Sequence, residues 1–105
     1  MKQFITLTNM PLKEVLKGAF ISSLQTENLT ISYSYLKAGT EIPMHQHPEE
    51  AVDILLNGLL EMEIGSSTNS MTTGMISIVP GNIPHRAKAI TDCKVLTVFF
   101  PQRDI

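Results

Sequence analysis

Apolar and polar residues alternate along much of this chain with the period of two that is typical of a β-strand with one buried face. In residues 29–36 (LTISYSYL), leucine, isoleucine and both tyrosines share one face, and threonine and serine side chains lie on the other. Residues 59–64 (LLEMEI) place Leu60, Met62 and Ile64 opposite two glutamates. The alternation therefore predicts a strand in each of these segments.

Turn-forming residues separate these two segments from further apolar runs. Residues 37–43 (KAGTEIP) interrupt the first strand with a glycine and a proline, and residues 51–56 (AVDILL) predict the next one. The Asn57–Gly58 pair then predicts a hairpin turn into the strand at 59–64, because this dipeptide suits a tight turn with positive φ angles.

The second half of the chain continues in the same way. Residues 65–70 (GSSTNS) are uniformly polar or glycine, which predicts a loop. Residues 71–80 (MTTGMISIVP) and 92–101 (DCKVLTVFFP) predict two more strands, each closed by a proline.

One segment near the N-terminus has the features of a helix. Residues 10–18 (MPLKEVLKG) have a proline in the first turn, three apolar residues on one helical face and a glycine as a stop signal. This pattern predicts a surface helix of about two turns. Many short strands with so little helix are typical of a β-sandwich or a small β-barrel, and periodicity alone does not choose between them.

Composition excludes several classes of protein. The 105 residues are expected to form one domain, residues 1–105. The net charge of -2 attracts neither nucleic acid nor an anionic membrane surface, and we expect neither as a partner. The chain has no apolar run long enough to span a bilayer, and its first residues lack the apolar core of a signal peptide. Its one cysteine, Cys93, cannot form an intramolecular disulfide, which favours a cytoplasmic location.

Residues 44–50 (MHQHPEE) contain two of the three histidines of the chain. Alternate residues of a strand point to the same face, so His45 and His47 can aim at one point. The third, His85, begins a later strand segment, and three neutral imidazoles form a suitable site for a divalent transition metal. An isolated H-x-H pair is more often found on the surface, so the surrounding residues decide the interpretation.

Those surrounding residues resemble the two sequence motifs of the cupin superfamily. In the first motif a glycine, five residues, H-x-H and a closing glycine match Gly39, His45, His47 and Gly58. In the second motif a glycine, five residues and P-x-G-x-x-H match Gly74, Pro80 and His85. The resemblance implies an all-β cupin jelly-roll barrel, made of two antiparallel sheets, which would follow the short N-terminal helical turn. It also implies a divalent metal at His45, His47 and His85, and zinc, nickel, manganese and iron are all compatible with three imidazoles.

From about residue 10 onward the chain further resembles the small single-domain cupins of pectin and alginate degradation, which linearise and ketonise unsaturated uronates. Phe99, Pro101 and Arg103 match the C-terminal pattern of that group. The resemblance implies a sugar acid as the small-molecule substrate, with Arg103 and Phe99 in contact with it. A guanidinium group can hold a carboxylate through two hydrogen bonds, and an aromatic ring can pack against a sugar.

Two positions depart from the pattern of these cupins. Their acidic or glutamine metal ligand falls at Ala51, which cannot bind a metal. The nearby carboxylates Asp53, Glu50 and Glu49 are the candidates to replace this ligand, and Asp53 and Glu50 are also candidates to support the histidines by hydrogen bonding. Thr97 stands where the group has an aspartate, and a hydroxyl group does not titrate near neutral pH.

Three functions remain open from the sequence. The chain is either a metal-dependent isomerase, tautomerase or lyase, or a non-catalytic module that binds a sugar or a metal, an alternative that Ala51 and Thr97 favour. A dioxygenase with iron at three histidines is the third candidate, although no residue specifically supports oxygen chemistry. We also expect a homodimer that pairs through edge strands, because pairing covers open sheet edges.

Overall fold

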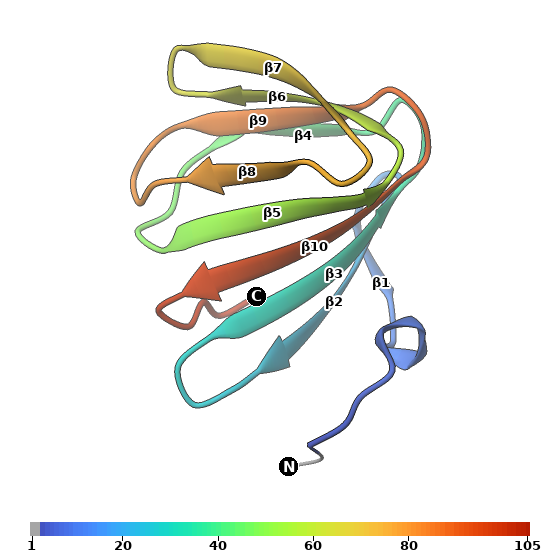
Figure 1. Cartoon of the computed structure of the whole chain (residues 1–105), viewed down its shortest axis with the longest axis vertical. Coiled ribbons are helices and arrows are strands. Elements are labelled where there is room, and N and C mark those ends of the chain that lie inside the picture. The colour runs from blue at the N-terminus through green and yellow to red at the C-terminus, as the bar shows by residue number, and fades with distance from the viewer. Residues whose placement is uncertain (1–2) are drawn as a thin grey trace.

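The computed structural model describes residues 3–105, and its ten strands form two antiparallel sheets that face each other (Figure 1). One 3-10 turn, η1 (Leu7–Asn9), precedes them. The strands are β1 (Lys13–Leu16), β2 (Ala19–Gln25), β3 (Thr30–Leu36), β4 (Glu41–His45), β5 (Glu50–Asn57), β6 (Leu59–Ile64), β7 (Ser67–Thr72), β8 (Ile76–Val79), β9 (His85–Ala89) and β10 (Cys93–Phe100). The predicted fold class, an antiparallel double-sheet jelly roll with one short N-terminal helical turn, is confirmed.

The order of the strands shows how the chain passes from sheet to sheet. Six strands form the first sheet in the order β1-β2-β3-β10-β5-β8, and four form the second in the order β4-β9-β6-β7. In Figure 1 the four-stranded sheet lies above the six-stranded one. β10, the last strand of the chain, pairs with both β3 and β5, so it lies in the middle of the larger sheet.

Alternate residues of both sheets point between them and form the core. Leu55, Val79 and Cys93 are almost completely buried there, and Leu60 and Met71 reach the same layer from the smaller sheet. The alternation of Leu60 and Met62 with exposed-face glutamates is the pattern that the sequence predicted for residues 59–64.

The predicted helix at residues 10–18 is wrong. Residues 13–16 form β1, which pairs with β2 through a tight turn at Lys17–Gly18, and the helical turn lies earlier, at Leu7–Asn9. Gly18 has a φ of 85°, so it supports the hairpin turn and not a helix end. The apolar residues of the segment are also largely exposed on an edge strand, which explains why their spacing carried little information.

The predicted hairpin at Asn57–Gly58 is also wrong. The strands on either side, β5 and β6, belong to different sheets and do not pair. Gly58 has a φ of 116°, and a side chain there would meet Cys93 Sγ at 2.8 Å. The pair is therefore the bend by which the chain crosses from one sheet to the other.

Three strand boundaries differ from prediction as well. In the predicted loop at 65–70, residues 67–70 belong to β7, and the hairpin turn is Gly65–Ser66. The strand predicted for 71–80 divides at a turn around Gly74 into the end of β7 and β8. β4 begins inside the predicted interruption at 37–43, because an edge strand tolerates a proline.

Candidate metal centre

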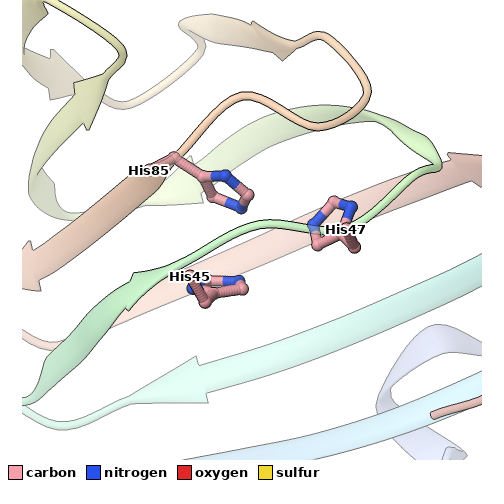
Figure 2. Close-up of side chains that lie close together, drawn as sticks. All are labelled: His45, His47 and His85. Carbon is pink, nitrogen blue, oxygen red and sulfur yellow. The ribbon is translucent and has the colours of Figure 1, made fainter.

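The three histidines converge from one end of the four-stranded sheet. His45 ends β4 and His85 begins β9, where their Cα atoms are direct partners across the two strands. His47 lies in the segment after β4, two residues further on, so it joins the group from a loop and not from the strand. Figure 2 shows the three imidazoles close together, and their ring centroids are 4.2 to 5.6 Å apart.

Each imidazole is held by a hydrogen bond to a backbone carbonyl group. The Nδ1 atoms of His45, His47 and His85 lie 2.9, 3.0 and 2.8 Å from carbonyl oxygens of residues 43, 49 and 83. A carbonyl oxygen only accepts, so each Nδ1 carries the proton and donates it. The Nε2 lone pairs are therefore available, which is the tautomer that a metal ligand requires.

The protonation states also suit a metal. His47 and His85 are only 5% and 7% exposed, and burial lowers the pKa of both imidazoles below the ordinary value, against the opposing effect of their backbone hydrogen bonds. A lowered pKa keeps these rings neutral at pH 7. One nitrogen from each of the three residues lies within 4.8 Å of the others, so small side-chain movements bring them to a common ion.

The histidines line a cavity of about 230 Å³ between the sheets. Most of its other wall is apolar, and it includes the Ala51 methyl group at the position where the cupin motif carries a further ligand. Among the described residues, Asp53 carries the only carboxylate side chain of this wall, and polar groups of Thr97 and Arg103 are among its other members.

Asp53 lies opposite Thr97 in the pairing of β5 with β10 and opposite Ser77 in the pairing of β5 with β8. Both hydroxyl groups donate to its carboxylate, Thr97 Oγ1 at 2.7 Å and Ser77 Oγ at 3.0 Å. Burial raises the pKa of Asp53 against the effect of these two hydrogen bonds. Asp53 does not belong to the group of ligand atoms within 4.8 Å, so the carboxylate is held beside the histidines and not among them.

The C-terminal segment lies at the cavity as well. Arg103 Nη1 donates to Glu49 Oε1 at 2.9 Å, and the Arg103 guanidinium carbon is 5.7 Å from the Phe99 ring centroid. The Phe99 ring is in turn 5.6 Å from the His47 ring, at a steep angle. The backbone N–H of Arg103 donates to Thr30 Oγ1 at 2.8 Å, which fixes the segment on the six-stranded sheet.

The family of the chain follows from comparison with known sequences. The sequence model of the cupin domain matches residues 32–99, which include all three histidines. The chain belongs to the cupin domain family.

Two proteins of similar sequence and one of similar structure give further comparisons. An uncharacterised protein of Streptomyces coelicolor is 28% identical over 85 residues, which are 80% of this chain and 81% of that protein. The H2HPP isomerase of Bacillus subtilis is 35% identical over 66 residues, which are 62% of this chain but only 28% of that protein. The structure of KdgF from Halomonas sp. superposes with a TM-score of 0.91 at 21% identity, over 99% of this chain and 97% of that one. The comparison with KdgF shows that the two proteins share a fold.

One further candidate residue of this cupin, Glu50, lies apart from the histidines. Glu50, the first residue of β5, is exposed and does not line the cavity. Ser77, whose hydroxyl group donates to Asp53, was not singled out by the sequence. Its signal was the alternation in β8, which is visible only once β8 is known to pair with β5. Within residues 3–105 the structure has no helix of the length and apolarity that a membrane crossing requires.

Proposed function

We propose that this cupin is a metal-dependent enzyme that isomerises a small sugar acid, such as an unsaturated uronate, by moving a proton within it. The observation that carries the proposal is the cavity wall, which combines one carboxyl group with three imidazoles whose Nε2 atoms are free. The 35% identical relative from Bacillus subtilis is named an isomerase, which supports this class of reaction.

His45, His47 and His85 would hold the metal, and zinc, nickel, manganese and iron all accept imidazole ligands. A bound divalent metal polarises a carbonyl or hydroxyl group of the substrate. Ala51 supplies no ligand, so the orientation of the three rings depends on their Nδ1 hydrogen bonds to the backbone.

Asp53 is the group that we assign to proton transfer. Ketonising an enol removes the hydroxyl proton and adds a proton to carbon, so the reaction needs a side chain that both accepts and releases one. The pKa of Asp53 is raised, so its carboxyl group exchanges its proton at a pH closer to neutrality than an ordinary aspartate does. The hydroxyl groups of Thr97 and Ser77 orient this carboxyl group. Thr97 on β10 has no carboxyl group, and Asp53, its partner on the neighbouring strand β5, supplies one instead.

Arg103 and Phe99 give the cavity a preference for a carboxylated sugar. Only one N–H of the Arg103 guanidinium is bonded to Glu49, and the group has further donors that can bind a carboxylate. The Phe99 ring, beside both Arg103 and His47, offers an apolar surface to the sugar.

The test combines metal analysis with turnover of unsaturated uronate, followed by ultraviolet absorbance. The wild-type chain is expected to carry near-stoichiometric transition metal and to consume the substrate, and His85→Ala to lose both. Asp53→Asn is expected to keep the metal and to lose at least about 100-fold in kcat, because only the proton carrier is changed. Gln46→Ala, an exposed change between the two ligand histidines, is the matched control and should keep both properties.

Two results would contradict this function in different ways. A wild-type chain that takes up none of the four metals, although circular dichroism shows it folded, would remove the metal site. A chain that binds metal and is stabilised by uronate against heat without forming product would instead be a non-catalytic sugar-binding module.

A further inference from the structure

Arg103 is the cation that the cavity presents to a bound anion. The chain has two arginines, and both belong to the cavity wall. Arg86 alternates along β9 with His85 and Ala87, which also line the cavity, and its Nε donates to Glu63 Oε1 at 3.0 Å. Its guanidinium group is therefore directed away from the cavity. Among the residues that the structure describes, no lysine lines this wall, so Arg103 is the one arginine or lysine left to bind an anion there.

The backbone of Arg103 is fixed to the six-stranded sheet. Its N–H donates to Thr30 Oγ1 at 2.8 Å, and its carbonyl oxygen accepts a hydrogen bond from Gln25 Nε2 at 2.9 Å. Thr30 is completely buried at the start of β3, which makes this a firm attachment. It fixes the backbone of Arg103 but leaves the long side chain its rotamer freedom. The direction of the guanidinium group therefore depends on the contacts of that group itself.

Glu49 supplies the hydrogen bond that directs the guanidinium group. Arg103 Nη1 donates to Glu49 Oε1 at 2.9 Å, and the two side chains are only 31% and 15% exposed. Glu49 does not line the cavity, and it is not in the group of potential metal ligands. Its Oε1 atom is 3.7 Å from His47 Nδ1, too far for a hydrogen bond, and that nitrogen donates to the Glu49 carbonyl oxygen instead. The Glu49 carboxylate therefore acts on the cavity through Arg103.

We propose that Glu49 is a positioning residue that directs Arg103 and restricts this end of the cavity to a group with one negative charge, a carboxylate and not a phosphate. The inference rests on the proposed function, because it takes the ligand to be a sugar acid. Glu49 occupies one N–H of the guanidinium group and leaves the others free. Two of these N–H groups suit the two oxygens of a carboxylate, which then shares the guanidinium charge with Glu49.

A phosphate group is disfavoured at the same place by its charge. A phosphate monoester carries close to two negative charges at pH 7, so beside Glu49 it places about three negative charges around one guanidinium group. Both side chains of the pair are largely buried, and water and salt screen charges weakly at such positions. A site discriminates between ligands by repelling the wrong one as well as by attracting the right one. Glu49 thus selects a sugar acid over a sugar phosphate.

The test is calorimetric titration of the full chain, as purified, with galactose, galacturonate and galactose 6-phosphate, which differ only at carbon 6. The wild type is expected to bind galacturonate at least about tenfold more tightly than the other two. Glu49→Gln keeps an acceptor oxygen for Arg103 but removes the charge. Its preference for galacturonate over galactose 6-phosphate is expected to fall at least about fivefold, because the dianion gains more than the monoanion. Glu27→Gln, the same change of charge at an exposed turn, is the matched control and should keep the wild-type preference.

Glu49→Ala separates the direction of the guanidinium group from the charge. It removes the acceptor oxygen as well, but keeps the backbone carbonyl group that holds His47. Galacturonate is expected to bind to it about tenfold more weakly than to Glu49→Gln, because Arg103 is no longer held in place. With unsaturated uronate as the substrate, the KM of Glu49→Ala should exceed that of Glu49→Gln by a similar factor. The kcat values should agree within about twofold, since Asp53 and the histidines are unchanged.

The role of Glu49 and the isomerase function can fail separately. An unchanged preference in Glu49→Gln, or a Glu49→Ala chain that binds galacturonate as tightly as Glu49→Gln, would overturn the role of Glu49 even where uronate is converted. So would a wild-type chain that binds galactose 6-phosphate as tightly as galacturonate, or that binds none of the three sugars. A wild-type chain with the expected preferences that converts no uronate would contradict the isomerase and leave the role of Glu49 intact. Far-ultraviolet circular dichroism of each variant confirms that the compared proteins are folded.

Discussion

At the scale of a single residue, the burial of Asp53 costs stability but gives the site a carboxyl group suited to proton transfer. Its carboxyl group lies in a largely apolar wall, where burial favours the neutral form and raises the pKa. The two hydroxyl donors, Thr97 and Ser77, favour the charged form but do not reverse the direction of the shift. A residue selected only for stability would avoid this position, which is why we connect it with proton transfer.

The raised pKa of Asp53 predicts how Asp53→Asn changes stability with pH. A carboxyl group whose pKa is higher in the folded chain than in the unfolded chain binds its proton more tightly when folded. The wild-type chain therefore loses stability from this group as the pH rises above the unfolded value of about 3.9 toward neutrality. We expect the metal-free Asp53→Asn chain to unfold at a higher temperature than the wild type at pH 7, and the difference to shrink toward about pH 4.

Thermal unfolding of both proteins over this pH range measures the effect. His47 and His85 have lowered pKa values, so their contribution to stability changes with pH in the opposite direction. Both histidines are present in the two proteins, so the part of their contribution that is independent of Asp53 cancels in the difference. The Asp53 charge opposes the lowering of the His85 pKa, and the loss of this effect in Asp53→Asn is part of the measured difference. An Asp53→Asn chain that is less stable than the wild type at neutral pH would show that the hydrogen bonds from Thr97 and Ser77 outweigh the cost of burial.

At the scale of elements, the turn between β8 and β9 holds the segment that carries His47. The Asn82 backbone N–H donates to the His47 carbonyl oxygen at 2.7 Å, and Gly81 lies directly against the Pro48 carbonyl group. A Cβ atom at Gly81 would collide with that carbonyl oxygen, so the glycine is required by space. The turn thus sets the position of His47 relative to His85, which begins the following strand.

Gly81→Ala is therefore expected to weaken both the fold and the metal site. Displacing the Pro48 backbone should lower the free energy of unfolding by about 1–3 kcal/mol and should reduce metal affinity by at least about tenfold. Gly74→Ala is the matched control, because Gly74 has a φ of 90° but no atom within 4 Å of the added carbon. It should cost roughly 1 kcal/mol of stability through backbone strain alone and leave metal affinity unchanged. Urea unfolding and metal competition titrations give both quantities, and equal loss of affinity in the two variants would contradict this role of Gly81.

The elements also show how far the sequence determines the fold. Strict alternation identified the strands at 29–36 and 59–64. Only the second buries its apolar face against the core, because in the first Ser32 and Ser34 line the cavity and Ile31 and Tyr35 lie on the other side of the strand. Strict alternation failed for β7, whose residues before Met71 are all polar and exposed, since an edge strand at the surface needs no apolar face. The Asn57–Gly58 pair was misleading because a positive φ serves a crossing between sheets as well as a hairpin. The histidine positions followed from spacing, but the meeting of Asp53 with Ser77 depends on a strand pairing that local sequence does not contain.

At the scale of the whole molecule, the two sheets contribute different parts of the candidate site. Asp53, Phe99 and the attachment of Arg103 lie on the six-stranded sheet. His45 and His85 lie at one end of the four-stranded sheet. The cavity between the sheets therefore brings the proposed metal ligands and the proposed proton carrier together, and neither sheet supplies both.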